Sequence, residues 1–477
     1  MSLKKKTIKG LTWSGFAQGI RQICQFVFTA VLARLLSPDD FGLLGMATVF
    51  TGFVTIFNDM GLSGALIQRK EIKEDHLSSI FWLNIFVGIV LTLIMIGASW
   101  GIAWFYQKDQ LQPILMFISI NFFLSSFTIV QQALLTRQMD FKHLAIVETV
   151  ALILSGVIGI TLACHNFGVW SLVYQFLAFT FFKMILLWFL SSWRPRFLFT
   201  KQAIKDVFHF SANQTGFEIV NYFARNLDYL VIGKFLGAEA LGFYTLAYKL
   251  MIYPLQNISW IISKVMFSTL SRVQDDLQKV RRIYMKLVKS ISLVTFPMMF
   301  GLFALAPEFV LTVFGEQWEP IIPLIRIFCA CGVVQSVGTT VGNILLSQGR
   351  ADLQFKLQLL GTVIVTIAIF IGLQWGTVGV ALAYTIQSVF WVHGTLYLAT
   401  RLIQLDFKVF YASLLNSYFV GLFIFLVILF IKGKIVLEQP LLLISLINIG
   451  LFSYAGWLIV TREIVFKDHK VKLAILQ

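Results

Sequence analysis

Long apolar runs alternate with short polar connections along the whole chain. Most runs hold roughly 20 apolar residues, which is the length an α-helix needs to cross the hydrocarbon core of a bilayer. The predicted spans are 11–36, 41–66, 79–105, 111–135, 144–164, 168–192, 209–236, 240–268, 287–306, 320–346, 355–374, 377–400, 411–431 and 441–461. The pattern therefore predicts an all-α integral membrane protein with about fourteen transmembrane helices.

Composition indicates the same class. The 477 residues are 58% hydrophobic and 13% charged, whereas a soluble domain has about 25% charged residues. The net charge is +15, but the basic residues form short clusters between apolar runs, so nucleic acid is not expected as a partner. With the N-terminus placed in the cytoplasm, the basic residues of the predicted outer loops are Lys108, Lys432 and Lys434. The positive-inside rule then predicts both termini in the cytoplasm, with membrane lipids attracted to the basic inner loops.

Two pairs of segments indicate an internal repeat. LARLLSPDDFGLLGMA, residues 32–47, matches IGKFLGAEALGFYTLA, residues 232–247, at an offset of 200. VQQALLTRQ, residues 130–138, matches VGNILLSQG, residues 341–349, at an offset of 211. The first six predicted helices are therefore expected to repeat as the next six. Parallel repeats of this kind predict two pseudo-twofold-related six-helix bundles around a central cavity.

The repeat also predicts a domain organisation, with two helices outside it. The predicted parts are an N-terminal six-helix bundle at 1–192, a cytoplasmic linker at 193–208, a second six-helix bundle at 209–400, and helices 13 and 14 with a cytoplasmic tail at 401–477. Bundles arranged in this way commonly rock against each other around a site between them.

The first helix of each predicted bundle is polar along one side. On a helical wheel of 100° per residue, one face of the 209–236 helix contains Gln214, Glu218, Asn221, Tyr222, Arg225, Asp228 and Tyr229. The matching face of the 11–36 helix contains Ser14, Gln18, Arg21, Gln22 and Gln25. A polar side cannot face lipid, so both faces are predicted to line the cavity, together with Tyr248 and Lys249 of the 240–268 helix.

Some of these positions also have a purely structural interpretation. Arg225 could pair within its helix with Asp228, three residues on, and with Glu218 on the same side. A charge near the bilayer centre costs at least about 2.5–3.5 kcal/mol, which favours a cavity-lining role over a structural pair alone. Arg34 and Lys234 lie near the outer helix ends, where long side chains can reach water, and the two interpretations are balanced there.

Three further charges lie in or near predicted spans. Asp59 is near the inner end of its helix, where simple solvation is the alternative to a functional role. Glu148 and Lys183 are isolated charges inside predicted spans, and the sequence assigns no partner to either of them.

No enzymatic motif accompanies these charges. The chain has no Walker loop, no H-E-x-x-H pair and no loop long enough to hold a catalytic domain. The six histidines are scattered, and the four cysteines lie in or beside apolar segments without a C-x-x-C pair. We therefore expect neither an enzyme nor a metal or cofactor site.

Three stretches of the sequence resemble a known family. VLARLLSPDDFGLLGMATVF at 31–50 and GLSGALIQRKEI at 61–72 are similar to the opening of bacterial polysaccharide flippases of the multidrug/oligosaccharidyl-lipid/polysaccharide exporter superfamily. QQALLTRQMDFKHLAIVE at 131–148 closely resembles the branch that exports colanic and teichuronic acid repeat units. The resemblance is clear through the first six predicted helices and looser toward the C-terminus.

The resemblance implies a substrate, a membrane and a set of residues. The substrate would be an oligosaccharide on undecaprenyl diphosphate, moved from the cytoplasmic to the outer leaflet of the bacterial cytoplasmic (inner) membrane. Arginine presents a planar fork to phosphate oxygens, and lysine presents a point charge. The residues implied for the diphosphate are Arg21, Arg225, Arg34 and Lys234. The candidates for coupling transport to H+ or Na+ are Asp228, Glu218 and Asp59.

Two other functions remain open at this point. A small-molecule antiporter of the multidrug type would have the same fold, but it would favour a net-negative, aromatic cavity. A structural scaffold for polysaccharide assembly proteins would need no cavity at all. The two polar faces carry Arg21 and Arg225 against Glu218 and Asp228, with further lysines nearby, which favours an anionic substrate.

Overall fold

The computed structural model describes residues 3–59, 62–68, 72–200, 221–222, 225–434, 437–461, 464–467 and 470–473. Some side chains inside these ranges, among them those of Ser14 and Asp59, are not described, and Gln214 and Glu218 lie outside the described residues. Within these ranges the chain is helical apart from its connections and a two-stranded antiparallel hairpin, β1 (Ile464–Lys467) and β2 (Lys470–Leu473). The predicted helical class is confirmed, and the hairpin is an addition that the sequence did not predict.

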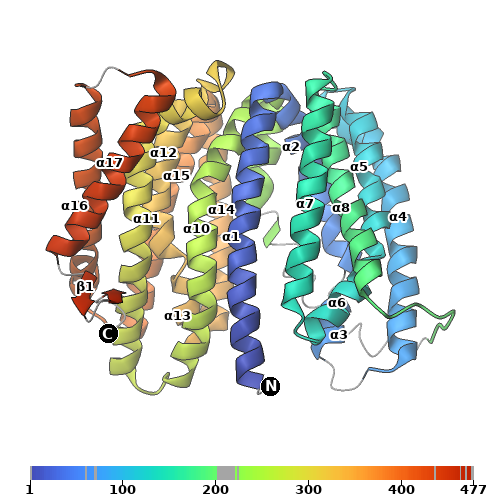
Figure 1. Cartoon of the computed structure of the whole chain (residues 1–477), viewed down its shortest axis with the longest axis horizontal. Coiled ribbons are helices and arrows are strands. Elements are labelled where there is room, and N and C mark those ends of the chain that lie inside the picture. The colour runs from blue at the N-terminus through green and yellow to red at the C-terminus, as the bar shows by residue number, and fades with distance from the viewer. Residues whose placement is uncertain are drawn as a thin grey trace. The chain divides into compact units, whose positions relative to one another are not determined.

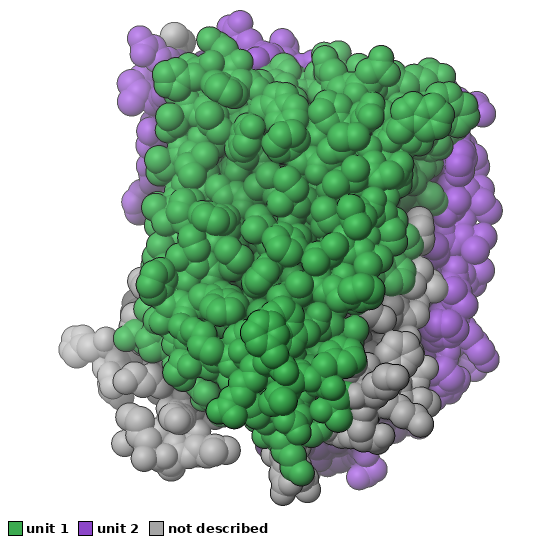
Figure 2. Space-filling model, turned by 90° about the vertical axis from the view of Figure 1, so that its right-hand side faces the viewer, with its two compact units in different colours: residues 1–242 green, residues 243–477 purple. Residues whose placement is uncertain are grey.

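The chain forms two compact units, residues 1–242 and 243–477, which are coloured separately in Figure 2. Helix α10 (Ala238–Arg272) begins in the first unit and continues into the second. The domain boundaries at 192, 208 and 400 stay a prediction.

The first unit is a bundle of helices (Figure 1). Its elements are α1 (Leu3–Leu35), α2 (Pro38–Asp59), α3 (Leu62–Gln68), α4 (Glu74–Tyr106), α5 (Leu111–Ser126), α6 (Ile129–Arg137), α7 (Phe141–Cys164), α8 (Val169–Leu190) and a helical segment at 225–236. Helix α4 packs along α5, and α7 packs against both α1 and α8. These contacts place the polar face of α1 next to α7.

The second unit is built around one long helix. Its elements after α10 are α11 (Leu277–Val313), η1 (Glu316–Trp318), α12 (Ile321–Gly338), α13 (Val341–Ser347), α14 (Ala351–Gly372), η2 (Leu373–Trp375), α15 (Gly376–Leu402), α16 (Phe407–Lys432) and α17 (Gln439–Val460). Helix α11 packs against α12, α16 and α17. The two helices that the sequence places outside the repeat, α16 and α17, are thus part of the core of this unit.

The start of α11 is fixed by a carboxylate. The Asp276 carboxylate accepts a hydrogen bond from the backbone amide of Lys279 at 3.1 Å. It also forms an ion pair with the Lys279 ammonium at 2.9 Å. These interactions with Lys279 hold the pKa of Asp276 below its ordinary value. The carboxylate is therefore charged at neutral pH, where it complements the positive end of the helix dipole.

Equivalent predicted spans are broken in the two units. Helices α5 and α6 meet at a bend of 43°, where the Thr128 hydroxyl donates to the Ser125 carbonyl at 2.7 Å. Helices α12 and α13 meet at Thr339 and Thr340, whose hydroxyls donate to the Ser336 and Val337 carbonyls. A hydroxyl that donates to a carbonyl of its own helix competes with the backbone amide for that carbonyl, and it often bends the helix. Because Thr128 and Thr339 differ by 211, the two breaks lie at matching positions of the second sequence repeat.

The helices confirm a multi-pass membrane protein. Nine in the described part of the chain are long and apolar enough to cross a bilayer, or ten if α5 and α6 form one bent span. One of the nine, Ala351–Leu402, consists of α14 and α15, which pack together and have 22 and 27 residues. At 1.5 Å per residue each is about 33–40 Å long and could cross alone. The expected number of fourteen spans stays a prediction.

Apolar side chains cover the surface of the first unit along α4. This helix lies on the side of the unit that Figure 2 turns toward the viewer. The most exposed large side chains on it are Phe86, Leu93, Trp100 and Trp104, at 63–72% exposure. Soluble proteins rarely expose such a patch, so this face is suited to contact lipid.

Two glycines of the first sequence repeat make a reciprocal contact. A Cβ atom added to Gly42 would overlap the Ala238 carbonyl, and one added to Gly242 would overlap the Pro38 carbonyl. Positions 42 and 242, like positions 38 and 238, are related by the offset of 200. The starts of α2 and α10 therefore approach so closely that only glycine fits at both positions.

Gly42→Ala is expected to lower the free energy of unfolding by about 1–3 kcal/mol, because the new methyl group meets a backbone carbonyl that cannot move alone. Denaturant titration of the purified protein in detergent would measure the change. Gly97→Ala on α4 is the control, because a Cβ there meets no atom within 4 Å. Equal stability of the two variants would contradict the close contact.

Candidate functional site

The polar face of α1 meets a carboxylate of α7. Arg21 forms an ion pair with Glu148, and its other terminal nitrogen donates a hydrogen bond to Gln18. The Arg21 and Glu148 side chains are 24% and 27% exposed. Glu148, an isolated charge in the sequence, is therefore the counter-ion of Arg21.

A second cation lies near this pair. Lys183 is half-buried on α8, which packs along the α7 helix that carries Glu148. No ion pair to Lys183 occurs among the residues that the structure describes. Glu148 and Lys183 have no predicted role, although the free-energy cost of a charge in a bilayer was the signal that could have identified them.

The rest of the predicted α1 face is varied. Gln22 is half-buried, and its Oε1 atom is buried without a hydrogen-bond partner in the described structure. Gln25 and Arg34 are exposed, the latter in the last turn of α1. The Ser14 side chain lies outside the part of the chain that the structure describes. The structure therefore brings Gln18 and Arg21 together but leaves Gln25 and Arg34 apart from them.

The predicted charged pair of the 209–236 helix is not formed in the part of that helix that is described. Asp228 is buried, at 5% exposure, and its Oδ1 atom accepts the backbone amide of Tyr229 at 2.9 Å. Arg225 is exposed, and no ion pair joins it to Asp228. Asn221 and Tyr229 are half-buried. The guanidinium of Arg225 is thus open to a ligand, while Asp228 faces the protein interior.

Two other residues of this helix bind to neighbouring helices. The Tyr222 hydroxyl donates to the Val49 carbonyl of α2 at 2.6 Å. The Lys234 ammonium donates to the Phe105 carbonyl of α4 and lies 4.9 Å from the centre of the Phe105 ring. Both contacts hold helices of the first unit together. Lys234 is therefore a packing residue here, whatever further role it has toward a substrate.

The second unit contains a separate polar network. The Tyr248 hydroxyl of α10 is 3.4 Å from that of Tyr384 of α15, which accepts a hydrogen bond from Gln335 of α12 at 2.9 Å. Gln335 also reaches the Ser388 hydroxyl at 3.3 Å. Lys249, the next residue along α10, is exposed. Tyr248 thus joins a network of hydroxyl and amide groups, which Lys249 does not enter.

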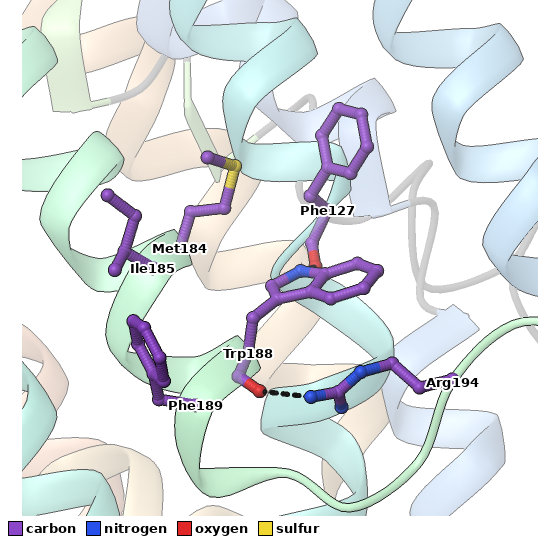
Figure 3. Close-up of a pocket in the computed structure, with 6 residues that line it drawn as sticks. All are labelled: Phe127, Met184, Ile185, Trp188, Phe189 and Arg194. Atoms are coloured by element: carbon purple, nitrogen blue, oxygen red, sulfur yellow. Dashed lines mark hydrogen bonds between the residues drawn. The ribbon is translucent and has the colours of Figure 1, made fainter.

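An apolar pocket opens beside the last turns of α8 (Figure 3). It has a volume of about 410 Å³ and its lining residues are Phe127, Met184, Ile185, Trp188, Phe189 and Arg194. The Arg194 guanidinium donates to the carbonyls of Trp188 and Ser191, at 2.9 and 2.5 Å, and so satisfies the end of α8. The pocket could hold a hydrocarbon chain, with a cation at one side.

The fold and these sites define a class of protein. The helices cross a membrane, and charged and polar groups gather inside each helical unit. No group of three or more metal-ligating side chains occurs among the described residues. The partly buried cation Arg21 lies beside an amide in the first unit, and hydroxyl and amide groups form a separate network in the second unit. The class is a polytopic membrane protein with polar groups inside its helical units.

Comparison with known proteins identifies the family. Residues 31–323 match the model of the family described as "Polysaccharide biosynthesis protein". The chain belongs to this family. It is 31% identical to the lipopolysaccharide biosynthesis protein WzxC of Escherichia coli K12, over 82% of this chain and 80% of the relative. It is 30% identical to the teichuronic acid biosynthesis protein TuaB of Bacillus subtilis 168, over 88% and 87%.

A solved structure shares the fold. The lipid II flippase MurJ, in an inward closed conformation, superposes with a TM-score of 0.75 and covers 94% of this chain and 99% of its own. The sequence identity is 16%, so the likeness concerns the fold alone. The resemblance to polysaccharide flippases expected from the sequence is confirmed.

Proposed function

We propose that the chain is a flippase that works by alternating access. Its substrate would be an oligosaccharide repeat unit on undecaprenyl diphosphate, moved from the cytoplasmic to the outer leaflet of the bacterial inner membrane for capsule or exopolysaccharide assembly. It would have both termini in the cytoplasm and no catalytic activity of its own. The names of the relatives, two biosynthesis proteins of surface polysaccharides and a lipid II flippase, support this proposal.

One observation supports an anionic substrate best. Inside the first unit, Arg21 pairs with a single carboxylate, Glu148, and Lys183 on the neighbouring helix α8 adds a second cation that has no ion pair among the described residues, so this region has an excess of positive charge. A cationic drug would be repelled by this region, whereas a diphosphate would compensate its excess charge. The charge balance therefore favours a lipid-linked diphosphate over the substrates of a multidrug antiporter.

Complementation of a flippase-deficient bacterial strain tests the proposal. Cells that make a defined lipid-linked oligosaccharide should recover surface polysaccharide when the chain is expressed, and their cytoplasmic lipid-linked intermediate should decrease. Recovery of drug resistance without polysaccharide export would favour the antiporter. Full membrane expression without either effect would favour the assembly scaffold.

Asp228 is our candidate for ion coupling, with Glu218 and Asp59 as the other two predicted carboxylates. A buried carboxylate can exchange a proton or bind Na+ when its surroundings change, and Asp228 is 5% exposed. Asp228→Asn is expected to make substrate flux in vesicles independent of the H+ or Na+ gradient that drives the wild type. An unchanged dependence on both gradients would exclude Asp228 as the coupling residue.

A further inference from the structure

We propose that Arg21, Glu148 and Lys183 form an anion site within the first unit, in which Glu148 is a resident counter-ion that the incoming diphosphate displaces from Arg21. The proposal rests on the proposed function for the identity of the diphosphate. It assigns roles to Glu148 and Lys183, two membrane charges that have no predicted role.

Glu148, which pairs with Arg21, and Lys183 lie at a similar depth on helices α7 and α8, which pack against each other. Glu148 is the eighth residue of α7, and Lys183 is seven residues before the end of α8. At 1.5 Å per residue, each lies about 10 Å from its helix end. Helix α7 begins and α8 ends toward the side that the sequence predicts to be cytoplasmic. The cluster is thus inside the bilayer, within reach of a substrate that enters from that side.

The charge balance of the cluster is incomplete. Arg21 and Lys183 contribute two positive charges, and Glu148 contributes one negative charge among the groups that the structure describes. An uncompensated cation inside a bilayer raises the free energy of the folded protein. A purely structural ion pair would need Arg21 and Glu148 but no Lys183. The extra cation instead fits a site that receives an anion carrying more charge than Glu148.

The geometry of Arg21 supports an exchange of partners. One terminal nitrogen holds the Glu148 carboxylate and the other holds the Gln18 amide oxygen, so the planar fork is already occupied by oxygen acceptors. Both ionic side chains are about a quarter exposed, so the pair is accessible to a ligand. Phosphate oxygens can replace these acceptors in the same plane. Lys183 then adds a second charge, which Glu148 alone does not neutralise.

This arrangement predicts opposite effects for the two partners of Arg21. Removing the negative charge of Glu148 removes a competitor, so diphosphate binding should become tighter. Removing Lys183 removes a cation from the bound state, so binding should become weaker. A residue with only a structural role would weaken binding in both cases, or leave it unchanged.

Binding of geranyl diphosphate, a short soluble prenyl diphosphate, would test the site in the purified full-length protein in nanodiscs. By isothermal titration calorimetry we expect Glu148→Gln to lower Kd by about tenfold and Lys183→Met to raise it by about tenfold, each equal to about 1.4 kcal/mol. Lys142→Met is the control, because it removes an exposed lysine from the first turn of the same α7 helix and should leave Kd unchanged. Size-exclusion profiles and melting temperatures would verify folding.

The outcomes separate this site from the proposed function. Absence of wild-type binding, or equal Kd values for the wild type and both variants, would overturn the anion site, even if complementation succeeds. Weaker binding by a folded Glu148→Gln variant would also overturn it, because the residue would then support the site rather than compete for it. Opposite shifts in the two variants would support the site, even if complementation fails.

Discussion

Lys432→Met is expected to lower the free energy of unfolding by about 3–5 kcal/mol, the largest stability effect we predict for a single change. Lys432, at the end of α16, pairs with Glu308 of α11 at 2.5 Å. Glu308 is 8% exposed, and its second oxygen is buried without a hydrogen-bond partner in the described structure. Without the lysine, a buried carboxylate would remain uncompensated between two helices.

The double variant Glu308→Gln with Lys432→Met isolates the cause. It removes both charges, so most of the lost stability should return. Lys434→Met is the matched control, because this nearby lysine lies over the exposed Phe430 ring and pairs with no described carboxylate. SDS-induced unfolding of the purified protein would measure the free energy of unfolding of the single variant, the double variant and the control. If the single and the double variant unfolded alike, the ion pair would not be the reason for the loss.

Arg225→Ala is expected to reduce the flux of lipid-linked oligosaccharide by at least about tenfold, which corresponds to about 1.4 kcal/mol. Arg225 is exposed and forms no ion pair with Asp228, so its guanidinium is available to a phosphate. Arg225→Lys keeps the charge but not the planar fork, and should retain an intermediate flux. Transport into vesicles with a fluorescent lipid-linked sugar would measure both variants.

The control for Arg225 is Arg282→Ala. Arg282 is exposed near the start of α11, outside the polar clusters, and its loss should leave flux unchanged. Wild-type flux in both folded Arg225 variants would show that this arginine does not grip the substrate. The anion site at Arg21 would be unaffected by that result, because it is carried by other helices.

The helical class and the repeat could be predicted because both depend on local sequence. A run of apolar residues is sufficient for a membrane helix, and the matched segments with offsets of 200 and 211 indicate the repeat, within which the contact at Gly42 and the break at Thr128 lie. The break itself was not predicted, since the span 111–135 is continuously apolar enough for one helix. It depends on hydroxyl groups that bend α5 into α6.

Partners across helices could not be predicted from the sequence. Glu148 is 127 residues from Arg21, and only the packing of α1 on α7 brings the two together. Conversely, a spacing of three residues suggested that Arg225 would pair with Asp228, but the Asp228 side chain turns to the Tyr229 amide instead. Spacing along a helix gives the side on which a residue lies, and tertiary packing decides which neighbour it binds.

A half-length protein that ended after the first repeat would contain Pro38 and Gly42 only once. Two copies related by a two-fold axis would rebuild the contact now made by the starts of α2 and α10, since Gly42 of each copy would meet residue 38 of the other. Such an isologous contact can be made by two copies of one sequence. The pair of glycines thus has the pattern of an isologous contact, made here within a single chain.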